Sequence, residues 1–183
     1  MADRFRVLVV EGNDGANTDK MRSLGASSYG EQYARLLESM SARVACDIAR
    51  PSEEGFQHDL TGYAGVAWTG SAMSAYEDRA EVTNQIRLAE RVFEAGLPMF
   101  GSCWGLQVAA VALGGKVWAN PKGREIGFAE RIEIRPGAET HPMLADRPKI
   151  YSALAVHRDE VEEVPDGAEV LASNGMSRVQ VMV

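Results

Sequence analysis

The sequence is poor in cysteine and lacks clusters of basic residues, and both shortages exclude classes of protein. Only two cysteines, Cys46 and Cys103, occur among the 183 residues, too few for a disulfide framework and typical of a reducing compartment. Lysine and arginine total 19 against 26 aspartates and glutamates, which gives a net charge of −7. Nonspecific binding to nucleic-acid phosphates requires clustered positive charge. We therefore expect a cytoplasmic protein that does not bind nucleic acid.

Long hydrophobic runs are also missing. The apolar run Val7–Val10 is too short for a signal peptide or a membrane span, and we see no lipid anchor, internal repeat or low-complexity segment. No two cysteines or histidines have the spacing of metal ligands, so we expect no metal and no other cofactor. With 45% hydrophobic and 25% charged residues, the composition is that of a soluble globular domain without a membrane partner.

The first hundred residues alternate short apolar runs with segments of helical periodicity. Apolar runs predict buried strands at residues 5–10, 44–49, 63–68 and 97–100. Apolar residues at helical spacing predict helices over Tyr29–Met40, after a Ser28 cap, and over Val82–Phe93, ending at Gly96. We expect an α/β fold with a doubly wound, mostly parallel, flavodoxin-like central sheet and helices on both faces.

A polar segment follows the first predicted strand. Residues 11–15 read Glu-Gly-Asn-Asp-Gly, and the chain from there to Ser28 is expected to form a loop. The pattern Gly-x-x-Gly lacks the third glycine of a dinucleotide fingerprint, and we expect no helix directly after it. Nucleotide binding is therefore not predicted.

Beyond Gly115 the chain becomes rich in strands. Alternating or apolar runs predict strands near residues 116–118, 128–135, 150–156, 168–172 and 178–183, separated by proline and glycine turns. The acidic cluster at residues 159–163 is most simply a solvated turn. We therefore expect a strand-rich C-terminal half in addition to the doubly wound sheet.

Cys103 lies in the sequence Gly101-Ser102-Cys103-Trp104-Gly105, between a predicted strand and a helix that is apolar nearly all round. The two glycines permit a tight turn and close packing. The positive end of the helix dipole favours the thiolate over the thiol, and the amide after the cysteine is available to an oxyanion. This context predicts a nucleophile, whereas Cys46, on a predicted strand, is interpreted as core packing.

Residues 101–107 resemble the nucleophile elbow of class I glutamine amidotransferases. Four further segments resemble the same family in the same order, the last two typical of the branch related to the glutaminase domain of GMP synthetase: residues 69–71, 112–117, 123–128 and 156–165. Five ordered matches are specific, although each alone would be weak. We therefore expect residues 1–183 to form a single class I glutamine amidotransferase-like domain that lacks its C-terminal end.

The resemblance implies a hydrolase of the glutamine side-chain amide. The Cys103 thiolate would attack the carbonyl carbon, form a thioester and release ammonia, and water would then free glutamate. By their positions in the motifs, Gly70 and Ser71 would form the oxyanion hole together with Trp104. The backbone amides of Ser71 and Trp104 would be the donors, although Ser71 stands where the family more often has a second glycine.

The resemblance also implies residues that bind the substrate. Gln107, Gly127 and Phe128 would hold the glutamine, and Glu125 would face its charged end. The substrate is a small molecule, glutamine or another γ-glutamyl compound. A synthetase or acceptor subunit is a possible partner, because the family's acceptors are bound by other domains or subunits.

The family's general base, a histidine in a His-Pro-Glu segment, has no counterpart in this sequence. His141 precedes a proline, but Met143 stands in place of the glutamate, and a surface loop is expected there. His157 falls in a segment near the family's active site, where a structural hydrogen bond is expected, and His58 carries no signal. The chain resembles a fragment whose missing end supplies the base, and as given it would then be inactive.

Two readings of the function remain open. The first is an amidotransferase-like cysteine hydrolase acting on glutamine, or on a γ-glutamyl peptide. The second is a non-catalytic glutamine-binding or regulatory module, because the histidine and glutamate pair is absent from these residues.

Overall fold

The computed structural model describes residues 4–52 and 58–183, and the chain forms two compact units. The first unit is Met1–Ala112 and the second is Leu113–Val183. Among the described residues, no helix combines the length and the apolar character that crossing a bilayer requires.

A four-stranded parallel sheet forms the centre of the first unit. Its order is β2-β1-β3-β4, with bounds Phe5–Val10 for β1, Val44–Ala49 for β2, Gly65–Trp68 for β3 and Met99–Gly101 for β4. All four strands point the same way, so the loops that follow them meet at one edge of the sheet. The predicted α/β fold with a parallel central sheet is confirmed.

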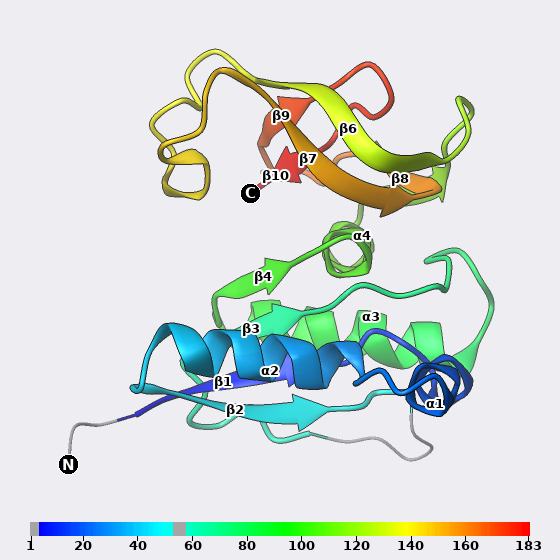
Figure 1. Ribbon diagram of the computed structural model, residues 1–183, viewed down its shortest axis with the longest axis vertical. Coiled ribbons are helices and arrows are strands. Elements are labelled where there is room, and N and C mark those ends of the chain that lie inside the picture. The colour runs from blue at the N-terminus through cyan, green and yellow to red at the C-terminus, as the bar shows by residue number, and fades with distance from the viewer. Residues whose placement is uncertain (1–3, 53–57) are drawn as a thin grey trace. The chain divides into compact units, whose positions relative to one another are not determined.

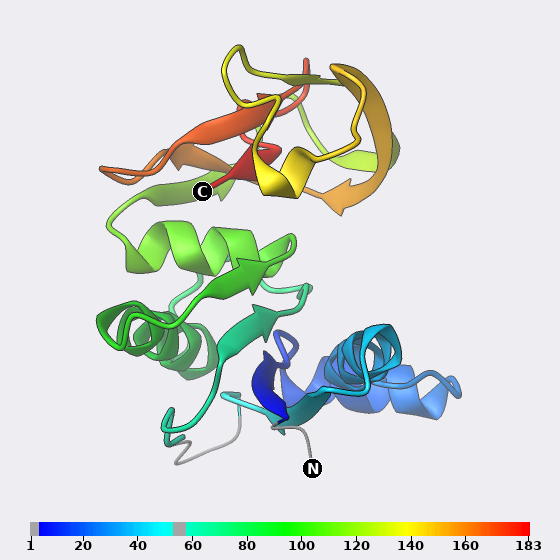
Figure 2. The same ribbon diagram turned by 90° about the vertical axis from the view of Figure 1, so that its left-hand side faces the viewer.

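Four helices accompany this sheet: α1 (Gly15–Ser23), α2 (Tyr29–Met40), α3 (Ala80–Glu94) and α4 (Trp104–Ala112). Helix α2 lies on one face of the sheet and α3 on the other (Figures 1 and 2). Ala34 of α2 packs on Val9 and Ala67 of the sheet, and the alternate residues Leu8, Val10 and Trp68 are fully buried as well. A sheet that is apolar on both faces needs cover on both, and the helices supply it.

The second unit is built from antiparallel strands. One sheet has the order β10-β9-β6-β7, and β5 pairs with β8 in a second, two-stranded sheet. The bounds are Lys116–Ala119 for β5, Glu125–Ile134 for β6, Ile150–His157 for β7, Asp159–Glu163 for β8, Val170–Ser173 for β9 and Val181–Met182 for β10, with a short 3-10 helix η1 at Pro142–Leu144. Ile134, Leu144 and Leu171 form a buried cluster in this unit.

Strands β6 and β7 carry an exposed apolar face. Phe128 is opposite Leu154 and Ile126 is opposite Val156, and each of these four side chains is more than half exposed. Ala129 and Ile132 point to the other face, where they are buried with Ala172.

Two sequence predictions about local structure are wrong. Residues 15–23, predicted to be loop, form helix α1, which the Asp14 side chain caps by accepting a hydrogen bond from the Asn17 amide at 2.8 Å. A helix therefore does open directly after the glycine pair at residues 12–15. The acidic cluster, predicted to be a turn, forms strand β8, in which Asp159 and Val161 point inward and are buried.

Candidate active site

Cys103 lies at the turn between β4 and α4, directly before the first residue of the helix. Its φ angle is +53°, a left-handed conformation that costs a residue with a β-carbon about 1 kcal/mol or more. The side chain is exposed. A strained backbone that presents an exposed thiol at a helix N-terminus is an arrangement found at functional sites.

The turn is possible because Gly101 and Gly105 let two backbone segments cross closely. A β-carbon on Gly101 would lie 2.6 Å from the carbonyl oxygen of Gly105, and one on Gly105 would lie 2.7 Å from the Trp68 β-carbon. Both distances are shorter than van der Waals contact. Strand β4, the start of α4 and the end of β3 therefore approach one another only if both positions are glycine.

The loop after β3 lies beside Cys103. A β-carbon on Gly70 would be 3.9 Å from the β-carbon of Cys103, so the structure brings these two predicted site residues together. The loop is fixed at both ends, because the Gly12 amide donates to Thr69 Oγ1 at 2.8 Å and the Ala72 amide donates to Asn13 Oδ1 at 3.2 Å.

Ser71 lies between these two anchors, and its hydroxyl accepts a hydrogen bond from the Met73 amide at 3.1 Å. The serine side chain therefore stabilises the loop that would carry an oxyanion donor.

Trp104 and Gln107 belong to the first turn of α4 and both are buried. The Gln107 amide donates to the Cys103 carbonyl at 3.2 Å, which continues the helix back to the cysteine. The first unit thus gathers the predicted residues Gly70, Ser71, Cys103, Trp104 and Gln107 around the ends of β3 and β4.

Glu125 belongs to the second unit, at the start of β6, where it is buried and holds several segments together. Its Oε1 accepts from Asn174 at 2.7 Å, and its Oε2 accepts from Gln180 at 2.7 Å and from the His157 ring at 2.8 Å. Burial by itself raises the pKa of Glu125, but these hydrogen bonds outweigh it and hold the pKa below the ordinary value. The carboxylate is therefore charged and fixed at neutral pH.

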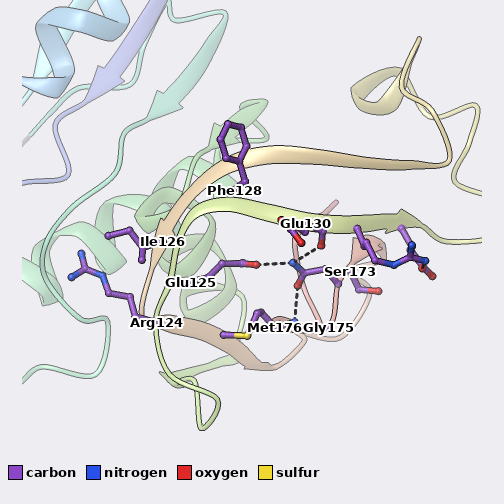
Figure 3. A pocket seen from close by; sticks show the side chains of 11 residues that line it. Arg124, Glu125, Ile126, Phe128, Glu130, Ser173, Gly175 and Met176 are labelled. Atoms are coloured by element: carbon purple, nitrogen blue, oxygen red, sulfur yellow. Dashed lines mark hydrogen bonds and ion pairs between the residues drawn. The ribbon is translucent and has the colours of Figure 1, made fainter.

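Gly127 and Phe128 follow on the same strand. Gly127 has a φ of +100° and Phe128 is 69% exposed. A pocket of about 660 Å³ opens in this unit, and Figure 3 shows its lining, to which Glu125, Phe128 and Met176 contribute. The assignment of Glu125, Gly127 and Phe128 to the substrate remains a prediction from the family resemblance.

The three histidines each make structural contacts. His157 Nδ1 lies 3.1 Å from the Asp159 carbonyl, and its Nε2 contacts Glu125, so the structure contains the hydrogen bonding expected of it. His141 accepts from the Met143 amide at 3.3 Å as the cap of η1. His58 lies 3.1 Å from the Tyr63 hydroxyl.

The structure adds residues that sequence reasoning missed. Gln85 is fully buried on α3 and contacts both Trp68 and Trp104. The sequence does give one indication of its role, because Gln85 is a polar residue three positions after Val82 and so lies on the apolar stripe of the helix. Asn174 and Gln180, the partners of Glu125, lie in turn and loop segments and carried no recognisable pattern. Among residues 4–52 and 58–183, no group of three or more acidic, histidine or cysteine side chains could hold a metal ion.

Comparison with known sequences places these features in a family context. The family model for class I glutamine amidotransferases matches residues 26–183. The chain is 32% identical over 177 residues to a gamma-glutamyl-L-1-hydroxyisopropylamide hydrolase from a Pseudomonas species, with 94% of this chain and 60% of that protein covered. It is 31% identical over 171 residues to a glutamine-hydrolysing GMP synthase from Thermomicrobium roseum, with 91% of this chain and 30% of the synthase covered.

Solved structures share the fold. A putative GMP synthase subunit from Thermoplasma acidophilum superposes with a TM-score of 0.76 at 18% identity, covering 100% of this chain and 79% of that one. A glutamine amidotransferase from Thermotoga maritima gives a TM-score of 0.70 at 23% identity, covering 98% and 71%. The matched family model, together with the sequence likeness to GMP synthases, establishes that this chain belongs to the class I glutamine amidotransferase family and resembles its GMP synthase branch.

Proposed function

We propose that this chain is the glutamine-hydrolysing part of an amidotransferase-type enzyme, with Cys103 as its nucleophile. The observation that carries the proposal is the exposed Cys103 in its left-handed turn at the start of α4. A helix N-terminus favours the thiolate. The positions of Gly70, Ser71 and Trp104 beside this turn support an oxyanion hole made from backbone amides.

The proposed reaction has two stages. The Cys103 sulfur forms a bond to the amide carbon of the substrate and the carbon–nitrogen bond breaks. The proton that the thiol gives up on ionising passes to the nitrogen, which leaves as ammonia. Water then attacks the thioester, which releases glutamate and regenerates the thiol. The scheme gives no proton-transfer role to His58, His141 or His157, because each of them makes hydrogen bonds within the fold.

A second candidate substrate is a γ-glutamyl amide other than glutamine. The observation that favours it is the likeness to the Pseudomonas hydrolase, to which this chain is 32% identical over 177 residues. The same nucleophile and oxyanion hole would serve both substrates, because both present a γ-carboxamide carbon. The two differ only in the leaving amine.

The test is covalent labelling of the chain by a chloroketone analogue of glutamine, followed by mass spectrometry of the modified peptide. We expect modification at Cys103, protection by glutamine or a γ-glutamyl amide, and none in Cys103→Ala. Equal modification of Cys46 in the folded protein would contradict the proposal. Release of ammonia or of an alkylamine, measured with the complete product of the gene, then identifies the preferred leaving group.

A further inference from the structure

A buried amide connects the elements that carry the proposed oxyanion hole. Gln85 on α3 is 0% exposed. Its Oε1 accepts hydrogen bonds from the indole nitrogens of Trp68, at 3.0 Å, and Trp104, at 2.7 Å. Its Nε2 donates to the Gly12 carbonyl at 2.9 Å. One side chain therefore joins the ends of β1 and β3 to the first turn of α4.

The two indoles depend on this acceptor. Both tryptophan side chains are fully buried, and each indole has one N–H and no acceptor of its own. Leaving a buried donor without an acceptor destabilises the arrangement that buries it. Because a single oxygen accepts from both, a change in the position of Gln85 disturbs both rings together.

The contact with Trp104 fixes one side of the proposed oxyanion hole. Trp104 is the residue after Cys103, and its backbone amide is the proposed donor. Its ring packs tightly, since a β-carbon on Gly12 would lie 2.8 Å from Trp104 Cδ1. A ring that is held at its nitrogen and against Gly12 fixes the backbone of the first helical turn.

The contact with Gly12 fixes the other side. The Gly12 amide donates to Thr69 Oγ1, and the neighbouring Asn13 accepts from the Ala72 amide. These two bonds hold the loop that contains Ser71, the second proposed donor. Gly12 also lies directly against this loop, because a β-carbon added at Gly12 would be 2.6 Å from the Gly70 carbonyl oxygen.

We propose that Gln85 is a positioning residue that sets the distance between the two halves of the oxyanion hole, acting through Trp104 on one side and Gly12 on the other. This inference rests on the proposed function of Cys103. Gln85 does not touch the substrate in this scheme. Its effect is on the geometry in which the amides stabilise developing negative charge, and such geometry affects the rate of the chemical step more than binding.

The experiment compares Gln85→Met with the parent protein in a Trp118→Phe background, so that emission comes from Trp68 and Trp104 alone. Methionine retains the length of the side chain and removes the amide. We expect the maximal rate of modification by the chloroketone to fall roughly 10- to 100-fold, with half-saturation changed less than about threefold. The fluorescence maximum should shift, because both indole N–H groups lose their acceptor. Gln32→Met, an exposed position on α2, is the matched control and should leave both readouts unchanged.

A second comparison keeps the test decisive if Gln85→Met does not fold. Trp104→Phe and Trp68→Phe each remove one hydrogen bond to Gln85, but only Trp104 carries a proposed oxyanion donor on its backbone. We expect the maximal rate of modification to fall at least about fivefold more in Trp104→Phe than in Trp68→Phe. Where Gln85→Met folds, its effect and that of Trp104→Phe should be less than additive in the double variant.

The outcomes separate the two proposals. If Cys103 is not modified in the parent protein, the proposed function is wrong. If Cys103 is modified with glutamine protection and Gln85→Met reacts at the parent rate, the proposed function stands and the role of Gln85 is overturned. Equal effects of Trp104→Phe and Trp68→Phe would also overturn it.

Discussion

The two cysteines of the first unit have different surroundings, and these predict different reactivity. Cys103 is exposed at a helix N-terminus, whereas Cys46 lies on β2. Burial first, and then the negative charges of Glu38 and Asp47, raise the pKa of Cys46 to about 11. The thiolate is the reactive form, so Cys46 is nearly unreactive at neutral pH.

A pH series with iodoacetamide measures this difference. A raised pKa means that the Cys46 thiolate fraction grows about tenfold per pH unit until the pH reaches the pKa. We expect the rate of Cys46 labelling to rise about tenfold per unit between pH 7 and pH 10, while Cys103 is already labelled at pH 7. A Cys46 rate that levels off below pH 9 would show that burial does not raise its pKa.

The glycine at position 105 is predicted to be irreplaceable. In Gly105→Ala the new β-carbon would meet the Trp68 β-carbon at 2.7 Å and its carbonyl oxygen at 2.8 Å, so the backbone must shift. We expect a loss of about 2 kcal/mol or more in the free energy of unfolding, measured by urea denaturation. Gly15→Ala is the control, because a β-carbon there meets nothing within 4 Å and we expect a change within about 0.5 kcal/mol.

At the scale of elements, α2 has a complete N-terminal cap. Ser28 Oγ accepts from the Glu31 amide at 3.2 Å, and Glu31 Oε2 accepts from the Ser28 amide at 3.0 Å. Loss of such a cap costs about 1 kcal/mol. We expect Ser28→Ala to lower the free energy of unfolding by about that amount, while Ser39→Ala, exposed near the end of the same helix, changes it by less than about 0.5 kcal/mol. Equal effects would mean that the cap does not stabilise the fold.

Elements whose apolar residues recur at a regular spacing could be predicted from the sequence, whereas elements stabilised by polar contacts could not. Helix α2 was found with its cap because its apolar residues recur at helical spacing. Helix α1 has one buried residue, Thr18. It therefore lacks the stripe of apolar residues by which a helix is recognised in a sequence. It is fixed at its start by Asp14, which also forms an ion pair with Arg79 at 2.8 Å.

The same limit applies to the candidate site. The turn around Cys103 could be predicted, because a strand and a helix that cross this closely require residues without a β-carbon, and Gly101 and Gly105 stand on either side of the cysteine. The contacts of Gln85 could not, because they join residues 73, 17 and 19 positions apart in the chain. No periodicity links such positions, and only the folded sheet brings them together.

For the whole molecule, charged carboxylates in both units predict loss of stability in acid. Arg6 holds the pKa of Asp47 below its ordinary value by hydrogen bonding. Burial raises the pKa of Asp14, but hydrogen bonds from Asn17 and Arg79 outweigh burial and lower the pKa overall. At Glu125, hydrogen bonds from Asn174, Gln180 and His157 do the same. A folded pKa below the unfolded one means that the unfolded chain binds protons first, so stability is present above the unfolded values and is lost as the pH falls through the folded ones.

Urea unfolding followed by circular dichroism at pH 7, 5, 4 and 3 tests this. Little change is expected between pH 7 and pH 5, and a progressive fall below the reference values of 3.8 for aspartate and 4.5 for glutamate. The variant Glu125→Gln should be less stable at pH 7 and should lose less on acidification, since one titrating group is gone. A free energy of unfolding that is constant down to pH 3 would contradict the assigned shifts.

The left-handed backbone at Cys103 has a consequence for how such proteins evolve. Glycine adopts that conformation without strain, so replacing the cysteine by glycine removes the thiol and relieves a penalty of about 1 kcal/mol. A single nucleotide change converts a cysteine codon into a glycine codon. A duplicated gene can therefore lose the proposed nucleophile in one mutational step while its product still folds.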